Sequence, residues 1–196
     1  MLRVFLLFVS VISAEGAMAI EQPRFQVIDK VDAVEIRSYE PMNVARTRVH
    51  GDFGKVGNKA FRRLAGYIFG DNAGDRKIAM TAPVSQVKEG DEYSVTFMMP
   101  SKYTIDELPK PQDKDVELVH LPAQTMAAIR YRGGWSEKLY RANETRLKAA
   151  IRDSTKWKIS GEPVWARYNS PMMPSIFRTN EILVPVSRIE GDKPVD

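Results

Sequence analysis

The sequence predicts an α+β domain with a mainly antiparallel sheet of about eight or nine strands and two helices. Three observations predict this class. The chain has 196 residues, of which 43% are hydrophobic and 28% charged, as in an ordinary globular domain. Short segments with strand character make up most of the pattern. Two longer segments repeat apolar residues at helical spacing, and each follows a glycine turn.

Composition excludes several kinds of site. The absence of cysteine excludes a thiolate nucleophile, an iron–sulfur cluster, a cysteine-based zinc site and a covalently attached haem. The net charge is +4, which suits an anionic small ligand or a membrane surface. It is weaker than the clustered charge of most nucleic-acid binders, so we expect no nucleic-acid partner.

Residues 1–19 have the pattern of a signal peptide. Arg3 supplies the positive start, Val4 to Ile12 is apolar, and Ala17-Met18-Ala19 is a small-x-small cleavage pattern. Cleavage would leave Ile20 first. The apolar run is shorter than the roughly 20 residues of a membrane span, so we expect an exported, periplasmic protein without a stable span. An uncleaved anchor is the alternative.

The rest of the chain, residues 20–196, is expected to form one domain from two repeats, about 25–99 and 115–186. Position 116 aligns with position 34, an offset of 116 − 34 = 82. Two repeats of this length favour a pseudo-two-fold domain over a solenoid. The aligned residues are Val34-Glu35 with Val116-Glu117, Ala45 with Ala127, Arg48 with Arg130, Gly51 with Gly133, and Phe53 with Trp135.

The repeats place similar elements in the same order. The first repeat predicts strands at residues 25–31, 33–38, 44–50, 78–84 and 93–99, with a helix between Gly54 and Gly70. A proline-containing linker, residues 100–111, follows. The second repeat predicts strands at residues 116–121, 125–132, 164–168 and 182–186. Its helix spans residues 135–152, with Ser136 as the N-cap.

Few residues indicate chemistry by themselves. The sequence has no glycine-rich phosphate loop, no serine elbow and no metal-ligand spacing. Of its two histidines, His50 lies on the charged face of a predicted strand and His120 near a strand end, and both fit a solvated role. No catalytic residue is assigned. A hydrolase would need a buried acid or base, for which the candidates are Glu35, Glu117 and Glu181.

The segment Lys77-Ile78-Ala79-Met80-Thr81-Ala82-Pro83-Val84 resembles the signature of the SOUL haem-binding protein family. Residues 34–39, 60–70, 168–171 and 178–181 resemble it too, and the similarity spans residues 25–186. The resemblance implies a distorted antiparallel β-barrel flanked by two helices. It also implies two related halves and a fold shared with small-molecule effector-binding domains.

The resemblance implies non-covalent binding of b-type haem or another tetrapyrrole, as a carrier or buffer. The expected site is an apolar groove beside the first helix, with basic residues near the propionates. Its expected residues are Asn58, Lys59, Phe61, Arg62, Arg63, Leu64 and Ala65 on the helix, Met42 before it, and Met172 in a later loop.

The chain departs from the family pattern at two points. Asn58 and Gly66 stand where haem-binding relatives place an arginine and a lysine, so Lys59, Arg62 or Arg63 would have to replace them. Residues 41–43 correspond to a segment to which an axial histidine has been assigned, and they contain none. Met42 and His50 are the remaining axial candidates, and a pocket without an axial ligand still holds porphyrin by apolar burial.

Three other interpretations stay open. The same fold is compatible with binding another lipophilic or amphipathic molecule, with hydrolysis in the same pocket, or with a role in protein interaction. Phe61, Leu64 and Ala65 also fit a plain core role, because they lie on the apolar face of an amphipathic helix.

Overall fold

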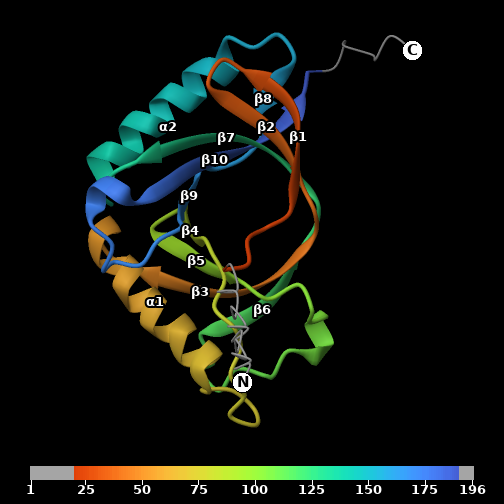
Figure 1. Ribbon diagram of the computed structural model, residues 1–196, viewed down its shortest axis with the longest axis vertical. Helices are drawn as coiled ribbons and strands as arrows, with labels where there is room; N and C mark the ends of the chain where they lie inside the picture. The colour runs from red at the N-terminus through yellow and green to blue at the C-terminus, as the bar shows by residue number, and fades with distance from the viewer. Residues whose placement is uncertain (1–19, 190–196) are drawn as a thin grey trace, which may run out of the picture.

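The computed structural model describes residues 20–189, which form one curled sheet with two helices on its outside (Figure 1). The strands are β1 (Phe25–Val31), β2 (Val34–Tyr39), β3 (Met42–His50), β4 (Val84–Glu89), β5 (Glu92–Met98), β6 (Val116–Leu121), β7 (Gln124–Arg132), β8 (Trp157–Ile159), β9 (Val164–Arg167) and β10 (Thr179–Arg188). The helices are α1 (Phe53–Phe69) and α2 (Glu137–Arg152), with single 3-10 turns at Ile105–Glu107 and Ser175–Phe177.

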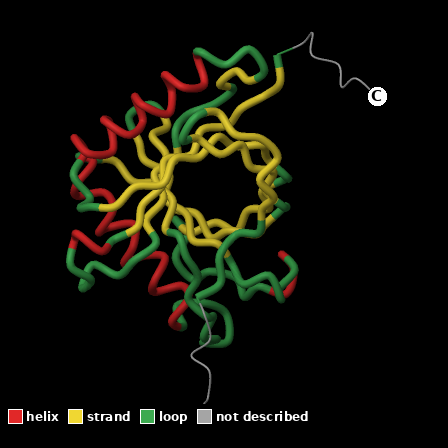
Figure 2. Tube along the Cα trace, turned by 45° about the horizontal axis from the view of Figure 1, so that its top comes forward, coloured by secondary structure: helices red, strands yellow, loops and turns green. Residues whose placement is uncertain are grey.

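All pairings between these strands are antiparallel, in the order β1-β2-β7-β10-β9-β4-β5-β3-β6, and β8 pairs with β10 beside this path. The strands curl around a central axis (Figure 2). In the described residues no ladder joins the edge strands β1 and β6, so the sheet is a half-barrel. The α+β class with a curled antiparallel sheet and two helices is therefore confirmed.

The strand order is symmetric about the β9–β4 pair. Outward from this pair, the strands on one side are β10, β7 and β2. On the other side their counterparts β5, β3 and β6 follow in the same order. Ala45 pairs with Leu118, and Ala127 pairs with Ile36. The offset of 82 between the repeats maps Ile36 onto Leu118 and Ala45 onto Ala127. The two pairings are therefore the same pairing, formed once by each repeat.

The glycines after β3 and β7 also adopt the same backbone conformation. The φ angle is 132° at Gly51 and 137° at Gly133, a region that side-chain-bearing residues rarely enter. A Cβ at position 133 would lie 2.7 Å from Leu139 Cδ2. Glycine is therefore needed where each strand turns into the segment that leads to its helix.

Both helices pack on the outer, convex face of the sheet and bury the main core. α1 packs against β3 and β5, and α2 against β7 and β8 (Figure 1). Side chains alternate along β10: Ile182 and Val184 join the core under the helices, whereas Leu183 belongs to a smaller apolar cluster on the concave face. Each central strand thus contributes to two different environments.

The helix ends follow the predicted signals. α1 begins after Asp52 and ends at Gly70, whose N–H donates to Gly66 O at 3.1 Å. At α2, Ser136 Oγ accepts a hydrogen bond from Leu139 N at 3.3 Å. The prediction of Ser136 as N-cap is confirmed.

The strands differ from the sequence-based expectations at three places. Residues 78–84 do not form a strand, because Ile78 N donates to Ile68 O at the end of α1 and Pro83 has no N–H for a ladder. β4 begins only at Val84. The short strand β8 was not expected, and β10 is longer at both ends than residues 182–186.

Candidate functional site

A hollow of about 290 Å³ lies on the concave face of the half-barrel and is partly open to solvent. We call it the interior groove. Its walls come from β2 to β7, β9 and β10, with Pro23, Pro83 and Pro122 at its margins. Both halves of the pseudo-symmetric sheet therefore build it. Its most apolar wall contains Met42, Met98, Leu121, Met126, Val164 and Leu183.

Along β3 and β5 the groove is apolar at one end and polar at the other. Along β5 the concave-facing residues are Ser94, Thr96 and Met98, and along β3 they run from Met42 to Arg46 in the opposite direction. Because β3 and β5 are antiparallel, the two methionines lie at the same end and Arg46 lies with the hydroxyl groups. This arrangement matches an amphipathic ligand with an apolar body and a polar edge.

Ion pairs set the charge of the polar end. Arg46 Nε donates to Glu117 Oε1 at 2.7 Å, and Arg48 contacts Glu117 at 2.6 Å and Glu89 at 3.2 Å. The hydrogen bond from Arg46 lowers the pKa of Glu117 despite some burial. Of these four residues, Arg46 and Glu89 line the groove, whereas Arg48 and Glu117 line a separate hollow.

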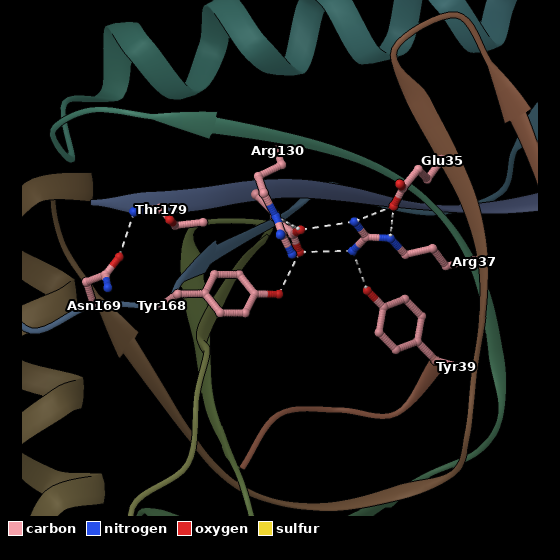
Figure 3. Close-up of polar contacts among 8 residues, drawn as sticks. Glu35, Arg37, Tyr39, Arg130, Tyr168, Asn169 and Thr179 are labelled. Atoms are coloured by element: carbon pink, nitrogen blue, oxygen red, sulfur yellow. Dashed lines mark hydrogen bonds and ion pairs between the residues drawn. The ribbon is translucent and has the colours of Figure 1, made fainter. Parts of the chain in front are cut away.

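A buried ionic network lies beside the groove on the same concave face (Figure 3). Glu181, with 0% of its surface exposed, accepts hydrogen bonds from both terminal nitrogens of Arg37 at 3.0 Å and from Arg130 Nε at 2.8 Å. Tyr168 Oη donates to the same carboxylate at 2.6 Å, and Arg37 donates to Tyr39 Oη at 3.0 Å. Tyr39 and Tyr168 also line the groove, so the network positions two of its walls.

The network keeps Glu181 ionised. Burial alone would raise the pKa of this carboxyl group, but hydrogen bonds from Arg37, Tyr168 and Arg130 outweigh burial and hold the pKa below its ordinary value. Burial and the neighbouring Glu181 raise the pKa of Tyr168. A carboxylate with a lowered pKa is a poor general acid or base near neutral pH, so Glu181 does not meet the requirement of the hydrolase interpretation.

The helix residues predicted to bind ligand lie in three environments. Leu64, with 0% exposure, and Ala65 are part of the buried core. Phe61 is half-buried against Phe97, with ring centroids 5.4 Å apart. Asn58, Lys59 and Arg62 point to solvent.

The hollow beside α1 is polar. It has a volume of about 480 Å³ and is lined by Lys59 and Arg63 of the helix, together with His50 and other charged side chains. Arg63 contacts Asp113 at 3.1 Å and Asp115 at 2.9 Å. The hollow that the structure places beside α1 is therefore lined by charged side chains. An apolar ligand groove beside this helix stays a prediction.

The remaining expected site residues, Met42, His50 and Met172, lie at three different places in the structure. Met42 lines the interior groove, whereas Met172 is 92% exposed on the loop between β9 and β10. His50 contacts Glu92 at 2.6 Å in the charged hollow, and His120 shares a 2.9 Å hydrogen bond with Asn43 at a separate hollow of about 130 Å³. Of the two axial candidates, Met42 is therefore the one at the interior groove.

Residues 20–189 contain neither a cluster of metal ligands nor a membrane-spanning helix. In that range no group of three or more histidine, aspartate or glutamate side chains is arranged to hold a metal ion. No helix within it has the length and apolar character needed to cross a membrane.

The sequence pattern alone does not predict the interior groove. Its lining residues Tyr39, Met98, Met126 and Tyr168 were not among the expected site residues, because each has the pattern of an ordinary strand residue. A signal was present in β5, where Phe97 packs in the core while Thr96 and Met98 face the other way. It required knowing that the sheet curls, which makes its second face concave.

Comparison with known proteins gives one family match. The model of the family described as "SOUL heme-binding protein" matches residues 20–185. Heme-binding protein 2 of Mus musculus is 29% identical over 185 residues, covering 86% of this chain and 88% of that protein. The Homo sapiens protein of the same name is 28% identical over 181 residues, covering 85% of this chain and 86% of its own length.

A solved structure supports the fold. The crystal structure of the EcmrR C-terminal domain superimposes on this chain with a TM-score of 0.63. The match covers 84% of this chain and 99% of the EcmrR domain. The sequence identity is 12%, so this similarity concerns the fold alone.

Proposed function

This chain belongs to the SOUL haem-binding protein family, and from that premise we propose that it binds haem or a related tetrapyrrole non-covalently in the interior groove. The observation that carries the proposal is the polarity of this groove, with methionines at one end and Arg46 with hydroxyl groups at the other. A tetrapyrrole has the same division, since its macrocycle is apolar and its carboxylates lie along one edge.

The described residues fit such a ligand as follows. Met42, Met98 and Met126 supply an adaptable apolar wall for the macrocycle. Arg46 would meet a carboxylate, in competition with Glu117. The volume is near the lower limit of about 300 Å³ for small-molecule sites, so a bound macrocycle would extend through the open side of the groove.

Bound haem would supply an iron centre, and Met42, which lines the groove, would offer its thioether to that iron. With apolar burial as the main source of affinity, we propose a b-type, non-covalent complex and a role in carrying or buffering the tetrapyrrole. If the natural ligand is another lipophilic or amphipathic molecule, its apolar part would contact the methionines and its polar part would face Arg46.

A spectrophotometric titration tests this function. The purified protein is titrated with ferric haem and, separately, with iron-free protoporphyrin, and an unrelated basic protein serves as the control. We expect saturable one-to-one binding of both pigments. Ser85→Phe, which places a ring into the groove from β4, should weaken both affinities at least about tenfold. Ser160→Phe, on an exposed turn outside the groove, should leave both unchanged.

Two further variants locate the site and test the iron ligand. Arg62→Glu changes the exposed charge of α1 and should have no effect. Loss of affinity in this variant, with normal binding by Ser85→Phe, would place the site at the helix instead. Met42→Leu keeps the apolar volume and should weaken haem binding selectively. If neither pigment binds better than to the control protein, the tetrapyrrole proposal fails and other lipophilic anions become the ligands to screen.

We also propose that the protein is exported to the periplasm after removal of residues 1–19, which lie outside the described residues. Ile20 begins the described chain, and Glu21 O accepts a hydrogen bond from Ala82 N at 2.9 Å. The expected mature N-terminus is therefore close to a residue that the fold holds in place. Mass spectrometry of the exported protein should give a mass that begins at Ile20, and an intact Met1 would contradict the proposal.

A further inference from the structure

The loop between β9 and β10, residues 168–178, carries an exposed apolar tip, blue at the left of Figure 1. Met172 is 92% exposed, Ile176 68% and Phe177 56%, and Met173 is also exposed. Four exposed apolar side chains therefore lie within six consecutive positions, 172 to 177. None of them lines the interior groove.

The loop is held in this shape by the rest of the molecule. Arg178 Nε donates to Met173 O at 2.8 Å, and Arg178 Nη2 donates to Pro171 O at 2.6 Å. The same guanidinium group stacks on the Trp135 ring, 4.3 Å from its centroid. Thr179 N donates to Asn169 Oδ1 at 2.6 Å. The apolar side chains are therefore presented to solvent on an ordered support and are not a loosely packed part of the core.

The charges around the tip are positive. From Arg167 to Asn180 the chain contains no aspartate or glutamate. Arg132 is exposed and lies opposite Thr179 in the β7–β10 ladder. Within residues 20–189, neither Arg132 nor Arg178 forms an ion pair, and the nearby Glu137 is paired with Arg141 at 3.2 Å. An anionic surface would meet uncompensated positive charge beside the apolar tip.

We infer that this loop is a membrane-contact site, which inserts Met172, Ile176 and Phe177 among the lipids of an anionic bilayer surface while Arg132 and Arg178 face the headgroups. Interfacial binding gains strength both from the apolar area that is buried among lipids and from the attraction of adjacent cations to anionic headgroups. Trp135 at the root of the loop suits the headgroup region, because its ring is apolar and its N–H is polar. This inference does not depend on the proposed ligand of the groove.

A lipid surface fits the tip better than a second protein does. A stable protein interface needs about 800 Å² on each partner, usually with a hydrophobic centre and a polar rim. Here the apolar residues belong to one short loop, and the charge beside them has one sign. These properties match the combination of apolar insertion and attraction to anionic lipids.

Vesicle binding tests the inference. The purified protein is mixed with phosphatidylglycerol–phosphatidylcholine vesicles, and in parallel with phosphatidylcholine vesicles, and the bound fraction is measured by sedimentation. We expect binding to the anionic vesicles that decreases as salt is added. Ile176→Glu should reduce the partition coefficient at least about tenfold. Val27→Glu, a matched change at a 45% exposed apolar residue of β1, should not reduce it.

Fluorescence supplies a second readout. Of the three tryptophans, Trp157 and Trp165 are buried, so a change of emission on binding should report Trp135. We expect a blue shift with anionic vesicles that Ile176→Glu abolishes.

Several outcomes would overturn the inference. They are absence of wild-type binding to anionic vesicles, equal losses in Ile176→Glu and Val27→Glu, or an oligomer that Ile176→Glu dissociates while vesicle binding is unchanged. Loss of haem binding alone in Ile176→Glu would assign the loop to the ligand site. Failure of the tetrapyrrole proposal is separate, because it would appear in the pigment titration and leave vesicle binding intact.

Discussion

Glu181→Gln is expected to lower the free energy of unfolding by about 3 to 5 kcal/mol. The reason is that Arg37 is 3% exposed and would lose the buried carboxylate that accepts from both of its terminal nitrogens. Only the more exposed Glu35, at 2.8 Å, would remain to balance its charge. Chemical unfolding near neutral pH measures the loss. Glu117→Gln is the matched control, because Glu117 is 43% exposed in its ion pairs, and its loss should be below about 1 kcal/mol.

The same network predicts a pH dependence. The pKa of Glu181 lies below its ordinary value of 4.5 in the folded protein, so the unfolded chain binds this proton first as the pH falls. The stabilisation is therefore present above the ordinary pKa and is lost as the pH falls through the folded-state pKa. The difference in stability between wild type and Glu181→Gln should be constant near neutral pH and should narrow as the pH falls below the ordinary pKa of 4.5. A difference that stays constant below this pKa would contradict the proposed ionisation of Glu181.

A double variant separates the charge from the shape of the site. Arg37→Met together with Glu181→Gln removes the charge that Glu181→Gln alone leaves buried. It should be less destabilised than the sum of the two single variants, since residues that form a pair are not independent. Additive losses would show that packing, and not the uncompensated charge, causes the effect.

Trp165→Ala is expected to cost about 3 to 5 kcal/mol, the second of the two largest effects. Trp165 is fully buried, and its ring packs on Phe53 at 5.2 Å, Tyr140 at 6.2 Å and Tyr93 at 6.3 Å. Trp165 and Tyr93 belong to the strands β9 and β5, whereas Phe53 and Tyr140 belong to the two outer helices, α1 and α2. The cavity would therefore loosen the contact of both helices with the sheet.

Thermal and chemical unfolding check this prediction with two comparison variants. Phe177→Ala, at an exposed site, should change stability by no more than about 0.5 kcal/mol. Trp165→Phe should cost far less than the alanine variant. It keeps an aromatic ring and removes an indole N–H that has no hydrogen-bond partner in the described part of the chain. Equal losses in the alanine and phenylalanine variants would contradict the packing explanation.

Local patterns predicted most of the elements. The glycines at 51 and 133, the N-cap at Ser136 and the alternation along β3 and β7 act over a few residues, so they are visible in the sequence. The short strand β8 was not expected, and residues 78–84 were wrongly expected to form a strand. Their apolar character suits a strand, but contact of Ile78 with the end of α1 and the proline at 83 prevent a ladder there.

The site was predicted less completely than the fold. The helix residues Leu64 and Ala65 have the same pattern whether they pack against the sheet or face a ligand, and the structure places them in the core. Met98 and Met126 have an ordinary strand pattern, yet they line the groove from two different halves of the chain. Periodicity tells which residues share a face, and it does not tell whether that face is closed by a helix or left open.

By itself the sequence determined the α+β class, the two related halves and the resemblance to the family, because these properties depend on order, spacing and local motifs. The tertiary structure decided that the sheet curls, so that one face packs under the helices and the other encloses the groove. It also decided the pairing of Arg37 with Glu181, which are separated by 144 positions in the chain. Such a pair follows from the register of strands that meet only after folding, and no local pattern records it.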